Sequence, residues 1–342
     1  MSSSETNLAC RVCQAAMLPD DRYCERCGVR VGTVPHDQTP VARGCTACGA
    51  PAEAIDADRY CSRCGVRQRS PEDRQEIDLG VAAGVSDRGR VRARNEDALY
   101  LRTVGESGVA VVVCDGISSS LSADLAARGG ADAAGAVLAE ALRSEALPGD
   151  ALRGDEAMFA EATRNAVAAA QQTVLEVPWT SRSDLDVPSC TLVSAVCRDG
   201  ELAIGWVGDS RAYWIAEDGS RQLTVDHSWA QEQVAAGLLS AQEAGADTRA
   251  HAITRWLGRD APDGGAQVLT MRPTEPGQLV LCSDGLWNYA PDVAGIAALL
   301  DALPPGTAAI AAAHSLTDTA LAAGGHDNIT VAVLNVTASK EG

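Results

Sequence analysis

The sequence predicts a large α+β domain of packed antiparallel sheets flanked by helices, preceded by a small cysteine-rich module. Short apolar runs rich in Val alternate with longer Ala-rich stretches of helical spacing. The strand-like runs outnumber the helical stretches and mostly adjoin one another, which favours antiparallel pairing over a doubly wound parallel sheet. Eight of the twelve cysteines lie in the first 64 residues, and they predict the small module.

The small module is expected over residues 9–67, where the cysteines form two sets of CxxC pairs. The sequence DRYCERCGVR at 21–30 returns as DRYCSRCGVR at 58–67. Two CxxC pairs turn four thiolates toward one point, which suits Zn²⁺ in a closed tetrahedral site. The predicted zinc ligands are Cys10, Cys13, Cys24, Cys27, Cys45, Cys48, Cys61 and Cys64. The module resembles a double zinc ribbon with two structural Zn²⁺ ions; a redox dithiol or an iron–sulfur site is the alternative.

The charge of the chain is unevenly distributed and bears on its partners. Residues 1–70 carry a net charge of +1, whereas the remaining 272 residues carry −19. A body that acidic repels nucleic acid and anionic membrane surfaces. A ribbon this small folds because metal binds, so we expect it to dock a protein partner or to regulate, and we expect no membrane partner. Nucleic-acid binding is the alternative function of a zinc ribbon; it is disfavoured here because Asp and Glu balance Arg in residues 1–70.

A polar, Pro-bearing stretch at 68–78 is expected to be a linker, and the large domain is expected over 79–338. The expected strands are 79–85, 97–104, 108–114, 190–197, 201–207, 211–216, 266–270, 278–283 and 328–336. The expected helices are 122–143, 156–176, 228–244 and 306–323. No uncharged apolar run could span a bilayer and the first residues do not read as a leader, so we expect a cytoplasmic protein.

Three acidic motifs stand at the ends of apolar runs. VAVVVCDG carries Asp115, LVLCSDGLW carries Asp284, and GHDNITVAVL carries Asp327. Asp disfavours strands and is costly to bury unpaired, so three of them at strand ends make physical sense if they converge on a cation. Hard oxygen ligands of this kind suit Mg²⁺ or Mn²⁺. The motifs therefore predict a metal-dependent enzyme that handles phosphate.

Eight motifs occur in the order found in metal-dependent serine/threonine phosphatases. They are RVRARNEDALY, VVVCDG, PSCTLVSAV, GWVGDSRAYWI, LTVDHSW, ITRWLG, LCSDGLWNY and GHDNITVAVL. The stretch from about 79 to 337 thus resembles the protein phosphatase 2C-like (PPM) family in its bacterial form. The resemblance implies a β-sandwich flanked by helices in an α-β-β-α arrangement. It also implies hydrolysis of phosphoserine and phosphothreonine on signalling proteins, with a Ser/Thr protein kinase or its targets as partners.

Matched residue by residue, the resemblance implies two or three Mn²⁺ or Mg²⁺ ions as cofactors. Asp115 would bridge two ions, and the carbonyl of Gly116 would bind one of them. Asp284 and Asp327 would complete the shell of the second ion. Glu96 would hold metal-bound waters. The nucleophile would be a metal-bridged hydroxide that attacks the phosphorus directly.

Two further roles follow from the resemblance, each with an alternative. Asp209 would help to hold a third ion, or it is a turn residue ahead of a strand. Arg92 would bind the substrate phosphate, because a guanidinium matches phosphate oxygens with two parallel hydrogen bonds. Arg94 would point to the same face of an extended segment and is the alternative phosphate ligand.

The sequence departs from the family at DGISSS, where Ile117 follows Asp-Gly and cannot donate a proton. His227 is a candidate general acid, although a lone His more commonly satisfies local backbone groups. Residues 228–263 fit the variable flap that lies beside the cleft in this family. These departures keep open a second function, a catalytically weak pseudophosphatase that binds phosphoproteins as a scaffold.

Overall fold

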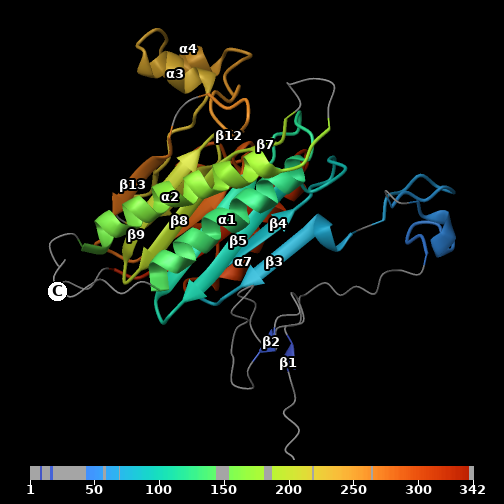
Figure 1. Cartoon of the computed structure of the whole chain (residues 1–342), viewed down its shortest axis with the longest axis horizontal. Coiled ribbons are helices and arrows are strands. Elements are labelled where there is room, and N and C mark those ends of the chain that lie inside the picture. Colours follow the sequence, from blue (N-terminus) through green and yellow to red (C-terminus); the bar gives the residue numbers. More distant parts are fainter. Residues whose placement is uncertain are drawn as a thin grey trace, which may run out of the picture. The chain divides into compact units, whose positions relative to one another are not determined.

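The structure, a computed structural model, describes residues 8–9, 16–17, 44–56, 59–68, 70–143, 154–180, 187–217, 219–262 and 265–338. The chain divides into two compact units, Met1–Glu76 and Ile77–Gly342. The larger unit confirms the predicted α+β class, because its sheets are antiparallel and helices cover them (Figure 1). Four of the predicted zinc ligands, Cys10, Cys13, Cys24 and Cys27, lie outside the described residues.

Two main sheets form the centre of the larger unit. The six-stranded sheet has the order β11 (Arg221–Gln222), β10 (Arg211–Ile215), β14 (Gly277–Cys282), β15 (Ile329–Val336), β4 (Ala82–Asp87) and β3 (Arg74–Asp78). The five-stranded sheet has the order β13 (Gln267–Met271), β9 (Glu201–Val207), β8 (Leu192–Arg198), β6 (Gly108–Asp115) and β5 (Asp97–Val104). A short pair, β7 (Ser189–Cys190) and β12 (Leu257–Gly258), completes the set.

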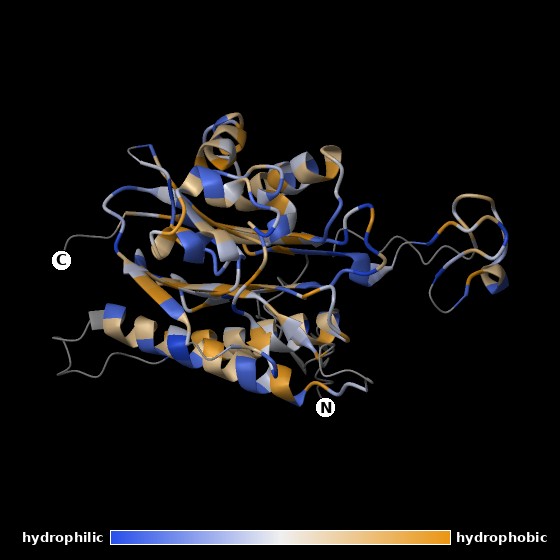
Figure 2. Cartoon of the chain, turned by 90° about the horizontal axis from the view of Figure 1, so that it is seen from above, coloured by the Kyte–Doolittle hydropathy of each residue, from blue (hydrophilic) through white to orange (hydrophobic). Residues whose placement is uncertain are grey.

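Helices cover the outer face of each sheet, as Figure 2 shows with the layers seen from above. The five-stranded sheet is covered by α1 (Ala123–Arg143) and α2 (Gly154–Glu176). The six-stranded sheet is covered by α5 (Asp284–Trp287), α6 (Val293–Asp301) and α7 (Ala309–Ala322). The flap contains α3 (Trp229–Ala235) and α4 (Ala241–Gly245). Within the described ranges, no helix combines the length and the apolar character needed to cross a bilayer.

The central strand β6 shows why the apolar runs fold as strands in this sandwich. Its side chains alternate, so Ala110, Val112 and Cys114 pack toward α1 and α2. Val111 and Val113 are also fully or almost fully buried, on the opposite face between the two sheets. Both faces of the strand are therefore apolar. For this reason its sequence is a continuous apolar run and does not alternate between apolar and polar residues.

Several elements differ from the prediction. The stretch 68–78, expected to be a linker, contains the 3₁₀ turn Pro71–Asp73 and strand β3. Because β3 lies at a sheet edge and is polar, its composition does not distinguish it from a loop. The helix expected over 228–244 is split into α3 and α4, with Gly237 at a φ of +67° between them. Helix α6 is short and was not predicted.

In the smaller unit, the described residues around the second cysteine set form two matching turns. The amide of Gly49 donates to the carbonyl of Cys45 at 2.9 Å, and the amide of Gly65 donates to that of Cys61 at 2.7 Å. Both glycines have left-handed backbone, with φ values of +69° and +72°. In the first set, β1 (Leu8–Ala9) pairs with β2 (Ala16–Met17).

The close approach of α1 to β5 yields a prediction about stability. A Cβ on Gly135 would overlap the ring of Tyr100. Replacing Gly by Ala in a helix gains about 1 kcal/mol of propensity, whereas overpacking costs roughly 1–3 kcal/mol. We expect Gly135→Ala to lower the midpoint of thermal unfolding by about 2–6 °C, measured by circular dichroism. Gly245→Ala in α4, where a Cβ meets nothing within 4 Å, is the control and should not lower it.

Candidate active site

The predicted acidic residues lie at one end of the sandwich, on ends of strands from both sheets. Asp115 ends β6 of the five-stranded sheet, and Asp209 lies in the turn after β9 of the same sheet. Asp284 opens α5 directly after β14, and Asp327 lies two residues before β15 in the six-stranded sheet. The fold thus brings together carboxylates that are as far as 212 positions apart in the sequence.

The carboxylates are close enough to disfavour one another's charge. Burial raises the pKa of Asp115 well above its ordinary value, and the charges of Asp97, Asp284, Asp209 and Asp327 raise it further. Burial and then the charge of Asp284 raise the pKa of Asp209 to about 7. Burial and then the charge of Asp327 raise the pKa of Asp284 to about 6. The site is therefore a concentration of negative potential that a cation would relieve.

The backbone around Asp115 leaves no room for a side chain at the next position. A Cβ on Gly116 would lie 2.6 Å from the carbonyl oxygen of Glu96 and 2.8 Å from that of Ala123. The amide of Gly116 donates to the carbonyl of Glu96 at 3.2 Å. The Asp-Gly pair therefore sits where β6, the loop before β5 and the start of α1 meet.

Arg92 lies among the acidic residues, on the loop between β4 and β5. Its Nη2 donates to Oδ2 of Asp327 at 2.5 Å. Glu96, farther along the loop, has a pKa raised by burial and opposed by a hydrogen bond with Ser118 and by the charge of Arg92. Arg94 contributes its backbone to this loop, since its carbonyl accepts from the side chain of Asn328. The structure thus places the Arg92 guanidinium against a site carboxylate.

Asn328 is a positioning residue that the sequence analysis quoted but assigned no role. Its Nδ2 donates to the carbonyls of Arg88 and Arg94, each at 2.8 Å. Its Oδ1 accepts from the amide of Glu96 at 2.8 Å. One buried side chain beside Asp327 therefore fixes the loop that carries Arg92 and Glu96. The signal available in the sequence was its place next to Asp327 in GHDN.

Asp97 is a second buried carboxylate beside the site. It faces Asp115 in the β5–β6 register. Ser283 donates to its Oδ2 at 2.7 Å, and its Oδ1 has no hydrogen-bond partner among the described residues. Burial raises the pKa of Asp97 to about 7, opposed by the hydrogen bond from Ser283. Asp97 thus links the start of β5 to the residue that precedes Asp284.

The donor set fits hard divalent cations, because carboxylate oxygens lie where negative charge is crowded. The oxygens are less tightly gathered than thiolates elsewhere in the chain. Among the described residues, only Cys45, Cys48, Cys61 and Cys64 have ligand atoms that all lie within 4.8 Å of one another. Oδ2 of Asp327 is held by Arg92, so a cation that used this oxygen would compete with the guanidinium.

The four cysteines fit a tetrahedral sulfur shell. The Sγ atoms of Cys45 and Cys64 are 3.5 Å apart, and those of Cys48 and Cys61 are 3.7 Å apart. Zn–S bonds of about 2.3 Å would separate the sulfurs by about 3.8 Å. Buried Gln68, which was not predicted to take part, donates through Nε2 to the Sγ of Cys45 at 3.3 Å. This side chain is placed to orient a metal-ligating thiolate.

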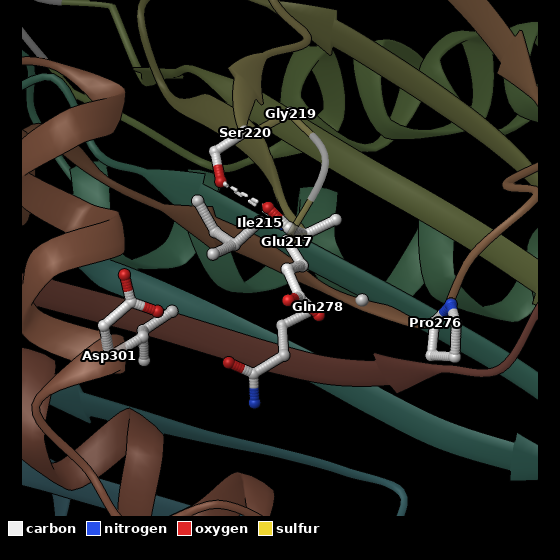
Figure 3. Close-up of a pocket in the computed structure, with 10 residues that line it drawn as sticks. Ile215, Glu217, Gly219, Ser220, Pro276, Gln278 and Asp301 are labelled. Carbon is white, nitrogen blue, oxygen red and sulfur yellow. Dashed lines mark hydrogen bonds between the residues drawn. The ribbon is translucent and has the colours of Figure 1, made fainter.

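A pocket of about 590 Å³ lies at the other end of the same strands. It is lined by the end of β10, the turn that follows, the start of β14 and the end of α6. Figure 3 shows Glu217, Gln278 and Asp301 around it. None of the predicted site residues lines this pocket, so it is separate from the acidic cluster.

Comparison with known proteins places this geometry in context. The family model for protein phosphatase 2C matches residues 87–321. The serine/threonine phosphatase stp of Listeria innocua is 30% identical over 248 residues, covering 72% of this chain and 92% of that protein. The crystal structure of the Mycobacterium tuberculosis serine/threonine phosphatase PstP/Ppp matches with a TM-score of 0.54 and 27% identity, covering 75% of this chain and 98% of that one. The catalytic domain of PstP in complex with two manganese ions matches with a TM-score of 0.55 and 26% identity, covering 75% and 97%.

The crowded carboxylates predict an unusual pH dependence of stability in metal-free protein. A carboxyl group whose pKa is raised on folding stabilises the fold below about pH 4, and this stabilisation is lost as the pH rises through the folded value, here about 6 to 7. His227, whose pKa burial lowers to about 4, acts in the opposite direction. The slope of the wild-type curve alone therefore does not isolate the carboxylates.

A substitution isolates them. With metal removed by chelator, we expect Asp115→Asn to raise the unfolding midpoint at pH 8 by about 4 °C or more, and to change it little at pH 5. Tryptophan fluorescence is the measurement, since all six Trp lie between positions 179 and 287 and report on the larger unit. Added Mn²⁺ should cancel or reverse the gain. An equal effect at both pH values would refute mutual repulsion as its cause.

Proposed function

The chain belongs to the protein phosphatase 2C family and is a protein serine/threonine phosphatase; on this premise we propose that its acidic cleft uses two or three Mn²⁺ or Mg²⁺ ions to hydrolyse phosphoserine and phosphothreonine. The observation that carries the proposal is the mutual proximity of Asp115, Asp209, Asp284 and Asp327. The Arg92 guanidinium is hydrogen-bonded to the last of these carboxylates. When bound, the ions would neutralise the phosphate dianion and acidify a water for attack on phosphorus. Phosphoproteins, among them targets of a Ser/Thr kinase, are the proposed substrates.

The residues of the cleft have separate tasks in this proposal. Asp115 and the Gly116 carbonyl would hold the ions from the five-stranded sheet, and Asp284 and Asp327 from the six-stranded sheet. Asp209 would serve the third ion. These assignments rest on donor chemistry and on the mutual proximity of the carboxylates.

Arg92 and Glu96 would act on substrate and water. A cation that takes Oδ2 of Asp327 would free the Arg92 guanidinium to form two parallel hydrogen bonds with a phosphate. Glu96, partly buried and hydrogen-bonded to Ser118, would orient water in the cleft. Ile117 offers no proton to the leaving alkoxide, so that proton would come from water.

We further propose that residues 9–67 bind two structural Zn²⁺ ions and dock a partner or substrate, while residues 79–338 form the phosphatase domain. The support is the sulfur geometry of the second cysteine set and the sequence repeat between the sets. A site closed by four thiolates keeps no position open for a substrate. The zinc module would therefore contribute to recognition and not to hydrolysis.

Removing one ligand tests the metal assignment. We expect Asp327→Asn to lower kcat/KM for a phosphothreonine peptide with Mn²⁺ by at least about a thousandfold, because it removes a carboxylate that would ligate the metal. Phosphate release with and without Mn²⁺ is the measurement. Asp247→Asn, which changes an exposed-face ion pair with Arg249 in the flap, should keep full activity. Mn²⁺-dependent turnover in folded Asp327→Asn would contradict the assignment, and no turnover in the wild type would favour a pseudophosphatase.

Removing one thiolate tests the role of the zinc module. We expect Cys61→Ser to lose bound zinc while hydrolysis of p-nitrophenyl phosphate stays within about twofold of the wild type, because a closed thiolate site is structural. Elemental analysis gives the zinc content, and Ser62→Ala is the neighbouring control. If hydrolysis of this small substrate collapsed while tryptophan fluorescence still showed a folded larger unit, a docking-only role would be wrong.

A further inference from the structure

The segment that leads from β11 into the flap is hydrogen-bonded to the start of β10 and to the turn before it, which carries Asp209. Thr224 accepts through Oγ1 from the amide of Ala212 at 3.1 Å. The carboxylate of Asp226 accepts from Nε and Nη2 of Arg211 at distances of 2.6 to 3.1 Å. His227 completes this row of contacts at the tip of the turn, where it binds Gly208. The row therefore holds the first residues of β10 and, through Gly208, the first residue of the turn after β9.

His227 uses both backbone groups of the residue before Asp209. Its Nδ1 accepts from the amide of Gly208 at 3.0 Å, and its own amide donates to the carbonyl of Gly208 at 2.9 Å. Gly208 has a φ of +105°, and a Cβ there would lie 2.6 Å from the side chain of Thr191. The turn is therefore confined to one conformation, and His227 is the side chain that closes it.

The same residue closes the base of the flap. The carbonyl of His227 accepts from the amide of Thr254 at 2.9 Å. Ser228 forms a bridge with Ile253, and the amide of Trp229 donates to the carbonyl of Ala252 at 2.9 Å. The segment that enters α3 and the segment that follows α4 are thus hydrogen-bonded to each other, beginning at His227.

Burying the His227 ring costs free energy, because one of its two ring nitrogens has no hydrogen-bond partner among the described residues. Its side chain is buried, with 6% exposed, and Nε2 has no hydrogen-bond partner among the described residues. Because Nδ1 accepts from Gly208, the neutral ring carries its proton on this unpartnered Nε2. An apolar side chain would avoid that cost but would leave the Gly208 amide unsatisfied. The hydrogen bond from the Gly208 amide to Nδ1 therefore accounts for a histidine at this position.

The placement of this turn decides where the Asp209 carboxylate points. The carbonyl of Asp209 accepts from Nε1 of Trp287 at 3.0 Å, so the residue is fixed from the α5 side as well. Its side chain is 6% exposed and lies within the field of Asp284. On the premise of the proposed phosphatase mechanism, we infer that His227 is a positioning residue that sets the Asp209 carboxylate in the acidic cluster and ties its placement to the base of the flap.

A double-mutant cycle in the full-length protein tests this inference. We expect His227→Leu to lower kcat/KM for a phosphothreonine peptide at saturating Mn²⁺ by about tenfold or more, and by less than about twofold when Asp209→Ala is already present. His227→Asn places Oδ1 near the position of Nδ1, so it should restore activity to within about threefold of the wild type.

Two readouts do not depend on turnover. Hydrogen exchange of the peptide that contains Gly208 should accelerate in His227→Leu and be protected again in His227→Asn, both in metal-free protein. Mn²⁺ titration by calorimetry should show the loss of the weakest binding step in His227→Leu and in Asp209→Ala alike, with the tighter steps kept.

Two outcomes would overturn the inference. One is an equal loss of activity from His227→Leu in both backgrounds. The other is full activity of Asp209→Ala beside an impaired His227→Leu. If His227→Leu does not fold, His227→Asn decides: a folded variant with fast exchange at Gly208 but wild-type activity contradicts the role. Failure of the phosphatase mechanism itself would be seen separately, as Mn²⁺-dependent turnover in Asp327→Asn.

Discussion

The mutual repulsion of partly and fully buried carboxylates is the constraint on which this end of the molecule depends. Burial is the largest cause of the raised pKa of Asp97, Asp115, Asp209 and Asp284, and the charge of at least one neighbouring carboxylate raises each pKa further. Such a cluster opposes folding at neutral pH. The apolar layers of the sandwich must supply the stability that holds it together, and they do so with Val and Ala packed on both faces of strands such as β6.

Hydrogen bonds to backbone hold the repelling groups in place. Asn328 fixes the loop of Arg92 through three bonds of 2.8 Å, and His227 fixes the turn of Asp209 through bonds of 3.0 and 2.9 Å. Neither side chain adds charge to the cluster, since Asn is neutral and the pKa of His227 is lowered to about 4. Neutral side chains thus determine the geometry, and charged ones provide the chemistry.

The sequence predicted the acidic residues more readily than the residues that hold them. Asp115 and Asp284 end apolar runs and are followed by Gly, a pattern visible without a structure. The partner of Arg211 is Asp226, fifteen positions away across a hairpin, and its choice depends on how that hairpin folds. Gln68 stood at the start of a predicted linker, and only the fold of the cysteine turns brings its amide to Cys45. Local patterns reveal strand ends, whereas such pairings arise from tertiary packing.

Backbone packing requires the glycines of the acidic motifs, in addition to any role they have in the chemistry of the site. A Cβ on Gly285 would overlap the carbonyl of Asn328, and one on Gly116 would lie 2.6 Å from the carbonyl of Glu96. Each Asp-Gly pair therefore marks a place where backbone from another strand end passes within contact of the chain. Close approach of backbone is what allows carboxylates from two sheets to lie near one another. In each motif the Asp supplies the carboxylate, and the Gly allows the close backbone approach that brings this carboxylate to the site. The two residues are therefore best interpreted together.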